Sequence, residues 1–302
     1  MSPDAAAAVE RAVRDTGYAT NQTARSLVTG RANSVAFLLS ERHDVLFADP
    51  TFSMLLQGAS KALTARTMTL VLLVAGTPDE RATVANYVRS GHVDGVLLIS
   101  SHEDDPMFGM LIESGIPTVS AGLPLGHEDD ISWVSINETD SAITMTNYLL
   151  GSGRERVAMI AGPQDTPGGR FRLEGFREAM GERFDPRLVA YGDFSIASGS
   201  AAASELLRSG EQFDAIFAAS DSMAAGAISA LTRAGLRVPE DVAVAGFDDS
   251  GLAADHDPPI TTMRQPWGEI SARMVSLLLD GNPRGRVRSE ILNTELVVRR
   301  SA

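Results

Sequence analysis

The spacing of hydrophobic residues changes in a regular way from residue 34 onward. Short, nearly continuous apolar runs alternate with longer stretches in which apolar residues recur at helical spacing. The apolar runs, which we predict to be strands, are residues 35–39, 69–74, 95–99, 118–120, 157–161, 188–191, 215–219 and 242–245. The predicted helices are residues 52–65, 80–90, 139–150, 171–180, 201–208 and 222–234. Strands without polar alternation are buried on both faces, which is typical of a parallel sheet covered by helices.

This alternation of strands and helices occurs twice, over about residues 35–135 and about residues 156–247. We therefore predict an α/β fold with two doubly wound parallel-sheet lobes. A chain of 302 residues is long enough to bury a core in each lobe. The dipeptides Gly162-Pro163 and Gln265-Pro266 are the predicted crossovers between the lobes.

The first 33 residues follow a different pattern. Ser2-Pro3-Asp4 predicts a helix start, with a hydroxyl cap, a proline at the first position and a carboxylate near the positive end of the helix dipole. From Asn21 to Thr29 the chain can form two or three further helical turns. So short a helix is marginal in water unless it has a partner. The residues alone leave two interpretations open, an ordinary linker helix or a helix that docks on a partner.

Charge is distributed unevenly along the chain. The formal net charge of −13 argues against a body that binds nucleic acid, because phosphate contacts need clustered Lys and Arg. Residues 1–33 carry a net charge of +1, and residues 17–33 contain no acidic side chain, so any DNA contact belongs at this end. The chain has no cysteine and no apolar run long enough to span a bilayer. These features predict a cytoplasmic protein with no membrane partner.

Residues 2–31, SPDAAAAVERAVRDTGYATNQTARSLVTGR, resemble the last headpiece helix and the hinge helix of the LacI/GalR family of bacterial transcription regulators. In that family two hinge helices pair in a dimer, enter the minor groove of DNA and wedge a leucine between base steps. The resemblance assigns DNA contact to Asn21, Ala24, Arg25 and Leu27. It implies that the two helices meet at Ala24 and that Leu27 is the wedge.

The family's helix-turn-helix, which reads the major groove, should precede this segment and is not found within residues 1–302. Ala5-Ala6-Ala7-Ala8 stands where relatives often carry Thr-Arg-x-Arg. From these residues we expect the 302-residue chain by itself to bind operator DNA weakly or not at all.

Further strings follow the family's order along the body, namely HVDGVLLIS, RVAMIAGP, RFRLEGFREAM, GDFSIASG, VPEDVAVAGFDDS and PPITTMRQP. The resemblance thus covers nearly the whole chain and implies a periplasmic-binding-protein-like (type I) clamshell with three crossovers. It implies a headpiece remnant plus hinge helix at residues 1–33, and an N-terminal lobe of residues 34–162 with about 265–290. Residues 163–264 with about 291–302 then form the C-terminal lobe, and the implied assembly is a homodimer.

In two facing lobes of this kind, a ligand binds outside the carboxyl ends of the strands. The resemblance places effector contacts at Phe52, Arg172, Phe194, Ser220 and Asp248. A carboxylate that accepts from paired hydroxyls, a guanidinium that donates and aromatic rings over an apolar face suit a sugar. The residues alone leave open that Arg172 and Asp248 form a structural ion pair and that both phenylalanines belong to the core.

The chain departs from the family's pattern within the expected pocket. Gly122-Leu123 stands where relatives often have Asp-Arg, and Ser220 stands where asparagine is frequent. The loop of residues 40–49 is longer than usual and contains Glu41 and His43. We therefore expect a re-shaped pocket.

Other clusters of polar residues predict no chemistry. His102-Glu-Asp-Asp105 and His127-Glu-Asp-Asp130 repeat one tetrapeptide, and consecutive loop residues rarely converge on one ion, so we predict solvated loops and no metal site. The glycines of residues 162–169 lack the Lys-Ser/Thr of a phosphate-binding loop. No serine pairs credibly with a histidine at a strand end. We predict no cofactor and no catalytic machinery.

The sequence thus predicts a DNA-binding transcriptional repressor whose operator affinity is controlled by a small-molecule effector bound between two lobes. The expected partners are operator DNA, a carbohydrate effector and a second copy of the chain. The alternative is a cytosolic sugar-binding sensor with no role on DNA, and an enzyme is a distant third.

Overall fold

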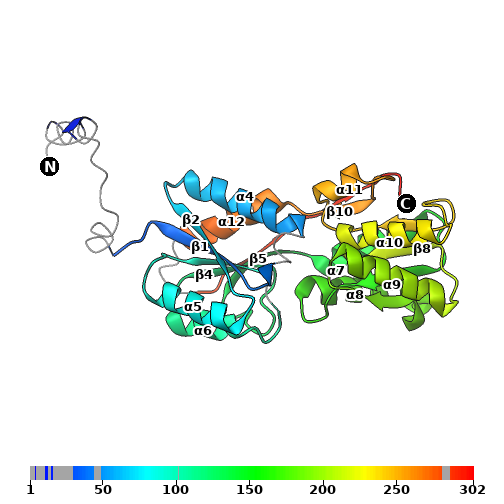
Figure 1. The fold of residues 1–302 in the computed structure, drawn as a ribbon, viewed down its shortest axis with the longest axis horizontal. Coiled ribbons are helices and arrows are strands. Elements are labelled where there is room, and N and C mark those ends of the chain that lie inside the picture. Colours follow the sequence, from blue (N-terminus) through cyan, green and yellow to red (C-terminus); the bar gives the residue numbers. More distant parts are fainter. Residues whose placement is uncertain are drawn as a thin grey trace.

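The computed structural model describes residues 30–43, 49–100, 102–280 and 286–302, together with Asp4, Arg11, Ala12 and Asp15. The predicted DNA contacts at Asn21, Ala24, Arg25 and Leu27 lie outside the described residues. From residue 34 onward the chain forms two α/β lobes that lie side by side along the long axis of the molecule (Figure 1).

The N-terminal lobe is built on a six-stranded parallel sheet in the order β11-β5-β4-β3-β1-β2. Its strands are β1 (Ser34–Leu39), β2 (Thr69–Val74), β3 (Val96–Ile99), β4 (Thr118–Ala121), β5 (Ser132–Ile136) and β11 (Ser289–Leu292). Helices α4 (Pro50–Thr64) and α12 (Trp267–Leu279) pack together on one face of this sheet. Helices α5 (Pro78–Arg89) and α6 (Pro106–Ser114) cover the other face (Figure 1).

Strand β1 explains why the apolar runs show no polar alternation. Val35 and Phe37 belong to the core beneath α4 and α12, whereas Ala36 and Leu38 belong to the core beneath α5 and α6. All four side chains are completely buried. Because successive residues of a strand point to opposite faces, a strand that is covered on both faces must be apolar at every position.

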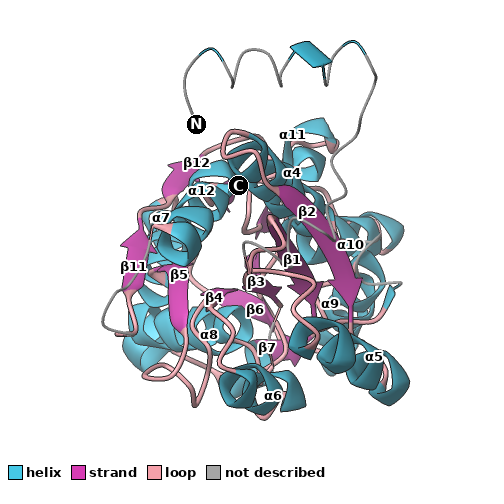
Figure 2. Cartoon of the chain, turned by 90° about the vertical axis from the view of Figure 1, so that its left-hand side faces the viewer, coloured by secondary structure: helices cyan, strands magenta, loops and turns pink. Residues whose placement is uncertain are grey.

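The C-terminal lobe is built on a four-stranded parallel sheet in the order β7-β6-β8-β9. Its strands are β6 (Val157–Ala161), β7 (Val189–Tyr191), β8 (Ala215–Ala218) and β9 (Ala243–Ala245). Helices α7 (Glu138–Gly151) and α8 (Pro167–Met180) pack as one pair, and α9 (Ile196–Ser209) and α10 (Asp221–Arg233) pack as another. Two 3-10 turns, Gly181–Arg183 and Pro186–Leu188, and the short helix α11 (Gly251–Asp255) complete the lobe. Figure 2 shows the helices arranged around the strands.

The described chain crosses between the lobes after β5, after β10 (Thr262–Arg264) and after β11. Strand β10 pairs in antiparallel fashion with β12 (Glu295–Val297), which follows the last crossing. The predicted crossover at Gln265-Pro266 lies between β10 and α12.

The other predicted crossover, Gly162-Pro163, is wrong. It follows β6, which lies in the C-terminal sheet, so the lobe boundary expected at residue 162 falls near Asn137 instead. The dipeptide serves close packing, because a Cβ on Gly169 of α8 would lie 1.8 Å from the Pro163 carbonyl oxygen. The lobe boundary expected near residue 290 lies inside β11, which pairs with β5 in the N-terminal sheet.

All eight predicted strands overlap observed strands, but two helices, α8 and α9, begin four and five residues earlier than their apolar spacing indicates. Thr166 caps α8 by accepting a hydrogen bond from Gly169 N, and Ser195 caps α9 by accepting from Ser198 N. The hydrophobic pattern predicts neither α6 and α12 nor the strands β5, β10, β11 and β12. Within the described part of the chain, no helix combines the length and the apolar character needed to cross a bilayer.

Candidate functional site

A cleft opens between the lobes at the carboxyl ends of their strands, where a ligand is expected in this architecture. Its open volume, mouth included, is about 870 Å³. Four of the five predicted effector contacts, Phe52, Arg172, Phe194 and Asp248, line this cleft.

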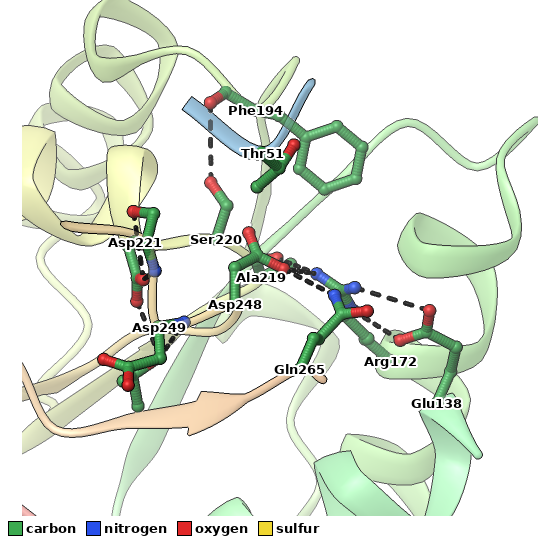
Figure 3. A network of polar contacts seen from close by, with 12 residues as sticks. Thr51, Glu138, Arg172, Phe194, Ala219, Ser220, Asp221, Asp248, Asp249 and Gln265 are labelled. Atoms are coloured by element: carbon green, nitrogen blue, oxygen red, sulfur yellow. Dashed lines mark hydrogen bonds and ion pairs between the residues drawn. The ribbon is translucent and has the colours of Figure 1, made fainter. Parts of the chain in front are cut away.

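Arg172 of α8 lies at the centre of the polar wall of the cleft (Figure 3). Its Nε donates to Glu138 Oε2 at 2.7 Å, and its Nη1 donates to the Ala219 carbonyl oxygen at 2.6 Å and lies 3.4 Å from Asp248 Oδ1. The guanidinium carbon lies 3.7 Å from the centre of the Phe247 ring. Burial by itself would lower the pKa of Arg172, but the Glu138 and Asp248 carboxylates overcome this effect and raise it. The cleft therefore holds a permanent buried cation.

Close packing of α7 on α8 brings Glu138 to Arg172. Gly175 lies almost one turn after Arg172, and a Cβ at Gly175 would lie 2.4 Å from the Thr139 carbonyl oxygen. Only a glycine allows α7 to approach this closely. Asn137 caps α7 by accepting from Asp140 N, so the helix begins at Glu138 directly after the lobe crossing.

Asp248 follows β9 and presents one carboxylate oxygen to the protein and one to the cleft. Gln265 Nε2 donates to Asp248 Oδ1 at 2.8 Å, on the same oxygen that faces Arg172 (Figure 3). Within the described ranges no protein group donates a hydrogen bond to Oδ2. Burial raises the pKa of Asp248 well above its usual value, and the charge of Arg172 opposes the rise. The carboxylate thus keeps free acceptor capacity for the hydroxyl groups of a ligand.

Three residues of the cleft wall have positive φ values, which residues that carry a Cβ rarely adopt. Ser100, Phe194 and Asp248 have φ values of 52°, 68° and 107°. The ring of Phe194 lies so close to Gly162 that a Cβ there would be 2.4 Å from the ring. Strained conformations of this kind concentrate at functional sites, where the surrounding structure holds them in place.

The N-terminal lobe gives the cleft an apolar wall. Phe52 and Leu55 come from α4, Ile99 ends β3, and Ile270 comes from α12. Phe52 is 7% exposed and also belongs to the core of its lobe, so the two roles proposed for this residue do not exclude each other. Trp267, at the start of α12, lines the cleft and donates from Nε1 to the Asp248 carbonyl oxygen at 3.0 Å.

Ser220 differs from the prediction. It is not among the residues that line the cleft, and its hydroxyl caps α10 by accepting a hydrogen bond from Met223 N at 3.1 Å. The same hydroxyl donates to the Phe194 carbonyl oxygen at 3.4 Å (Figure 3). The hydroxyl is thus engaged within the protein both as an acceptor and as a donor.

Asp221, next to Ser220, is a buried carboxylate that does not line the cleft. It accepts from Thr262 Oγ1 at 2.7 Å and from Ser250 N at 2.8 Å, which joins the start of α10 to the strand that leads to the second crossing. Burial raises the pKa of Asp221 to about 7, against these hydrogen bonds. Asp49, which lines the cleft and caps α4, also has a raised pKa, chiefly because of its burial.

The sequence analysis missed Glu138, Gln265 and Trp267 as cleft residues. Glu138 follows β5, which the hydrophobic pattern did not predict, so no strand end marked it. Gln265 and Trp267 flank Pro266 at a predicted crossover, and in a two-lobed fold a crossover borders the cleft. Their position beside a predicted crossover could therefore have identified both residues as cleft residues.

Gly122, where relatives often carry a polar side chain, lines the cleft and adds no side-chain donor. Among the described residues no group of three or more His, Cys, Asp or Glu side chains could hold a metal ion.

The prediction of solvated acidic loops is wrong for His102, which is partly buried between two carboxylates, whereas Glu103 is exposed and ion-paired. His102 bridges Glu41 of the N-terminal lobe and Asp165 of the C-terminal lobe, and Glu103 contacts Arg170 of α8.

Comparison with known proteins gives one consistent result along the whole chain. A family model described as a periplasmic binding protein-like domain matches residues 146–302. The chain is 43% identical over 308 aligned positions to the HTH-type transcriptional regulator CelR of Thermobifida fusca, with 100% of this chain and 90% of that protein covered. It is 31% identical to the HTH-type transcriptional repressor CytR of Escherichia coli strain K12, with 97% and 86% covered.

Solved structures agree with these relatives. A complex of the transcriptional regulator CelR with cellobiose superimposes with a TM-score of 0.86 at 40% identity, covering 100% of this chain and 92% of that chain. A putative transcriptional regulator LacI from Bacillus cereus subsp. cytotoxis superimposes with a TM-score of 0.84 at 25% identity, covering 89% and 98%.

Proposed function

The chain belongs to the LacI/GalR family of transcriptional regulators, and we propose that it is a cytoplasmic homodimer that changes its affinity for an operator when a β-linked glucose disaccharide such as cellobiose binds in its cleft. It is a transcriptional regulator controlled by a sugar effector, not an enzyme. A sensor without a role on DNA is not favoured, because the alignment with a DNA-binding regulator covers the whole chain, the segment before residue 34 included.

One observation carries the choice of ligand class. Arg172 and Asp248 lie 3.4 Å apart in the cleft wall, and Asp248 Oδ2 has no donor among the described residues. A neutral polyhydroxylated ligand supplies donors to this oxygen without adding a charge. An anionic ligand would have to lie beside the buried Asp248 carboxylate and the partly buried Asp49 carboxylate, which disfavours it.

The aromatic side chains of the cleft suit the faces of a sugar ring. Pyranose rings present C–H groups on their faces, and the aromatic side chains Phe52, Phe194 and Trp267 line the same cleft as the polar groups. Hydroxyl groups in the plane of the ring can then reach Arg172 and Asp248 while its faces contact apolar side chains. Closure around such a ligand buries both kinds of group, so the closed form binds more tightly than the open form.

The link from cleft to DNA begins where the chain enters the N-terminal lobe. Ala32 N and Asn33 N each donate to the Asp94 carboxylate at 2.7 Å, and Ser34 Oγ donates to the His92 carbonyl oxygen at 2.7 Å. The chain is thus anchored to the N-terminal lobe at Ala32, Asn33 and Ser34. We assign DNA contact to Asn21, Ala24, Arg25 and Leu27 on their resemblance to the hinge helix, which can fold or unfold on the minor groove.

The proposed dimer has support at the edge of the N-terminal sheet. Strand β2 lies at that edge, and its sequence TLVLLV is apolar while Leu72 is 42% exposed. An apolar edge strand in a monomer is a site for association. Pairing of two N-terminal lobes would bring the two copies of residues 21–29 together.

Isothermal titration calorimetry of the 302-residue chain with cellobiose, lactose, maltose and glucose tests the ligand. We expect cellobiose to bind at one site per chain and glucose to bind at least tenfold more weakly. Fluorescence anisotropy then tests the response, with residues 1–302 fused behind the helix-turn-helix of CelR and a selected operator duplex. Cellobiose should change operator affinity at least tenfold, and Leu27→Ala should weaken operator binding but leave cellobiose binding unchanged. Cellobiose binding without any operator response would contradict the proposed regulation.

A further inference from the structure

The loop that follows β3 makes contacts across the cleft that effector binding does not require. Glu103 N donates to the Asp165 carbonyl oxygen at 2.7 Å, although the two residues belong to different lobes. Asp165 lies in the loop between β6 and α8, at the carboxyl end of the C-terminal sheet. The loops that face each other at the edge of the cleft are therefore joined at the backbone.

His102 extends this contact with both ring nitrogens. Its Nε2 lies 2.7 Å from Glu41 Oε1 in its own lobe, and its Nδ1 lies 2.8 Å from Asp165 Oδ2 in the other lobe. Ser100 Oγ also donates to Glu41 Oε1, at 2.8 Å. Its hydrogen bond to Glu41 is the main cause that raises the pKa of His102 to about 9, with a further contribution from Asp165 and against partial burial. The imidazole is therefore a cation at neutral pH, placed between two carboxylates.

Arg170 of α8 makes a further contact across the cleft. Its guanidinium forms a two-pronged ion pair with the Glu103 carboxylate, one prong joining Nη1 to Oε1 at 3.2 Å and the other joining Nη2 to Oε2. Its Nε donates to the Gln164 carbonyl oxygen at 3.0 Å, which fixes the arginine on the β6–α8 loop. The Arg170 and Glu103 side chains are 31% and 43% exposed, so the pair lies at the mouth of the cleft.

These contacts lie at a distance from the lobe crossings, so they bear on the opening and closing of the cleft. The crossings of the N-terminal sheet occur after β5 and β11, and β3 lies two strands away from β5 in the sheet order. Ser100 and Thr166, which flank the contact, line the cleft itself. Contacts at a distance from the crossings must break when the lobes swing apart, whereas contacts beside the crossings need not.

We propose that His102 and Glu103 of the N-terminal lobe, with Asp165 and Arg170 of the C-terminal lobe, form a latch that holds the closed form and thereby sets the strength of effector binding. The proposal rests on the proposed function, since it assigns positioning residues to the same cleft. Exposed ion pairs are individually weak, but these contacts all act on one opening motion. When the closed form is only partly populated, apparent affinity falls by the fraction that is closed, so loss of the latch weakens the binding of a ligand that no latch residue touches.

The second copy of the tetrapeptide, residues 127–130, makes contacts of a different kind. His127 and Asp130 contact each other at 3.3 Å within one loop, and the His127 ring lies 4.8 Å from the Phe108 ring. All three residues belong to the N-terminal lobe. The same four residue types therefore reach across the cleft only where their loop faces α8.

A charge exchange across the cleft tests the latch. Glu103→Arg and Arg170→Glu each place like charges at the mouth, and we expect each to weaken cellobiose binding five- to tenfold in calorimetry. The double variant Glu103→Arg/Arg170→Glu restores an opposite pair and should bind within threefold of wild type. Arg187→Glu is the matched control, because Arg187 pairs with Asp185 and Glu211 on the surface of the C-terminal lobe alone. Full affinity in the single variants, or no restoration in the double variant, would overturn the proposal.

A second measurement needs no ligand and separates the latch from the proposed function. Small-angle X-ray scattering of the free protein should give a larger radius of gyration for each single variant than for wild type and for the double variant. If cellobiose fails to bind wild type but the scattering follows this order, the latch stands and the effector is another molecule. Equal radii for all forms, with intact circular dichroism spectra, would refute the latch whatever the effector is.

Discussion

The two walls of the cleft differ in chemistry. The wall from the C-terminal lobe presents the charged side chains Glu138, Arg172 and Asp248 beside Phe194. The wall from the N-terminal lobe is mostly apolar, with Phe52 and other apolar side chains beside Asp49. Charge-assisted hydrogen bonds demand a particular arrangement of donors and acceptors, but apolar contact demands only shape and area. We therefore expect the C-terminal lobe to recognise the sugar and the N-terminal lobe to respond by closing.

The two walls should also tolerate change differently. In the charged wall Arg172 compensates both Glu138 and Asp248, so removal of the arginine leaves uncompensated buried charges. In the apolar wall a shortened side chain loses contact area only, and its neighbours can relax. We therefore expect the largest effects of substitution in the charged wall, smaller effects in the apolar wall, and the smallest effects at the mouth of the cleft.

Arg172→Met should have the largest effect. It leaves Glu138 and Asp248 without the cation between them, and their side chains are only 11% and 10% exposed. We expect cellobiose affinity to fall more than 100-fold and the free energy of unfolding to fall by about 3–5 kcal/mol. Calorimetry and urea unfolding measure the two losses. Arg187→Met, which removes an arginine that is 66% exposed, is the control and should change neither.

Asp248→Asn separates binding from stability. The pKa of Asp248 is raised in the folded protein, so its ionised form costs folding free energy as the pH rises above the unfolded value near 3.8, and asparagine removes that cost. We expect cellobiose affinity to fall 10- to 100-fold while the melting temperature stays constant or rises. Asp221→Asn, at an equally buried carboxylate outside the cleft, should leave affinity within threefold. Intact affinity with a large loss of melting temperature in Asp248→Asn would mean that the ion pair is structural.

Phe52→Leu should have a moderate effect, since it trims the apolar wall without removing a hydrogen bond. We expect affinity to fall three- to tenfold and the free energy of unfolding to fall by about 1–2 kcal/mol. Phe108→Leu is the matched control, because Phe108 is completely buried between α6 and the same sheet but does not line the cleft. It should lose as much stability and no affinity; equal losses of affinity in both would show that the N-terminal wall acts only through the fold.

Substitution of His102 should have the smallest effect, which should appear in the pH dependence of stability. The pKa of His102 is raised from 6.5 to about 9, so its contribution to stability is complete below pH 6.5 and is lost as the pH rises through about 9. We expect thermal melts of wild type to fall more steeply than those of His102→Gln between these pH values. His127→Gln, at the other copy of the tetrapeptide, is the control and should keep the wild-type slope. Identical slopes in wild type and His102→Gln would contradict the contact.

The sequence predicts the strands well where burial on both faces makes a run wholly apolar, as in β1. It fails at β5, SWVSI, because a strand that borders the lobe junction mixes serine with apolar residues. Gly162-Pro163 suggested a crossover between the lobes, yet it reflects packing against Gly169, which no local pattern reveals.

Some residues of the candidate site could also be predicted from the sequence, and others could not. The resemblance supplied Arg172 and Asp248, which follow strands in a familiar order. Glu138, 34 residues before Arg172, enters the site only because Gly175 lets α7 approach α8. Ser220 stands at a strand end, but the start of α10 engages its hydroxyl as a cap. Contacts made by tertiary packing, the latch included, could not be read from one sequence.

A crystal structure of the chain with cellobiose would test most directly whether Arg172 and Asp248 bind the sugar. We expect a disaccharide in the cleft, with a pair of hydroxyl groups within hydrogen-bond distance of Asp248 Oδ2 and the Arg172 guanidinium, and a ring face against Phe52, Phe194 or Trp267. A sugar held in the cleft by the N-terminal wall alone, with the Arg172–Asp248 contact unchanged and untouched by ligand, would contradict it.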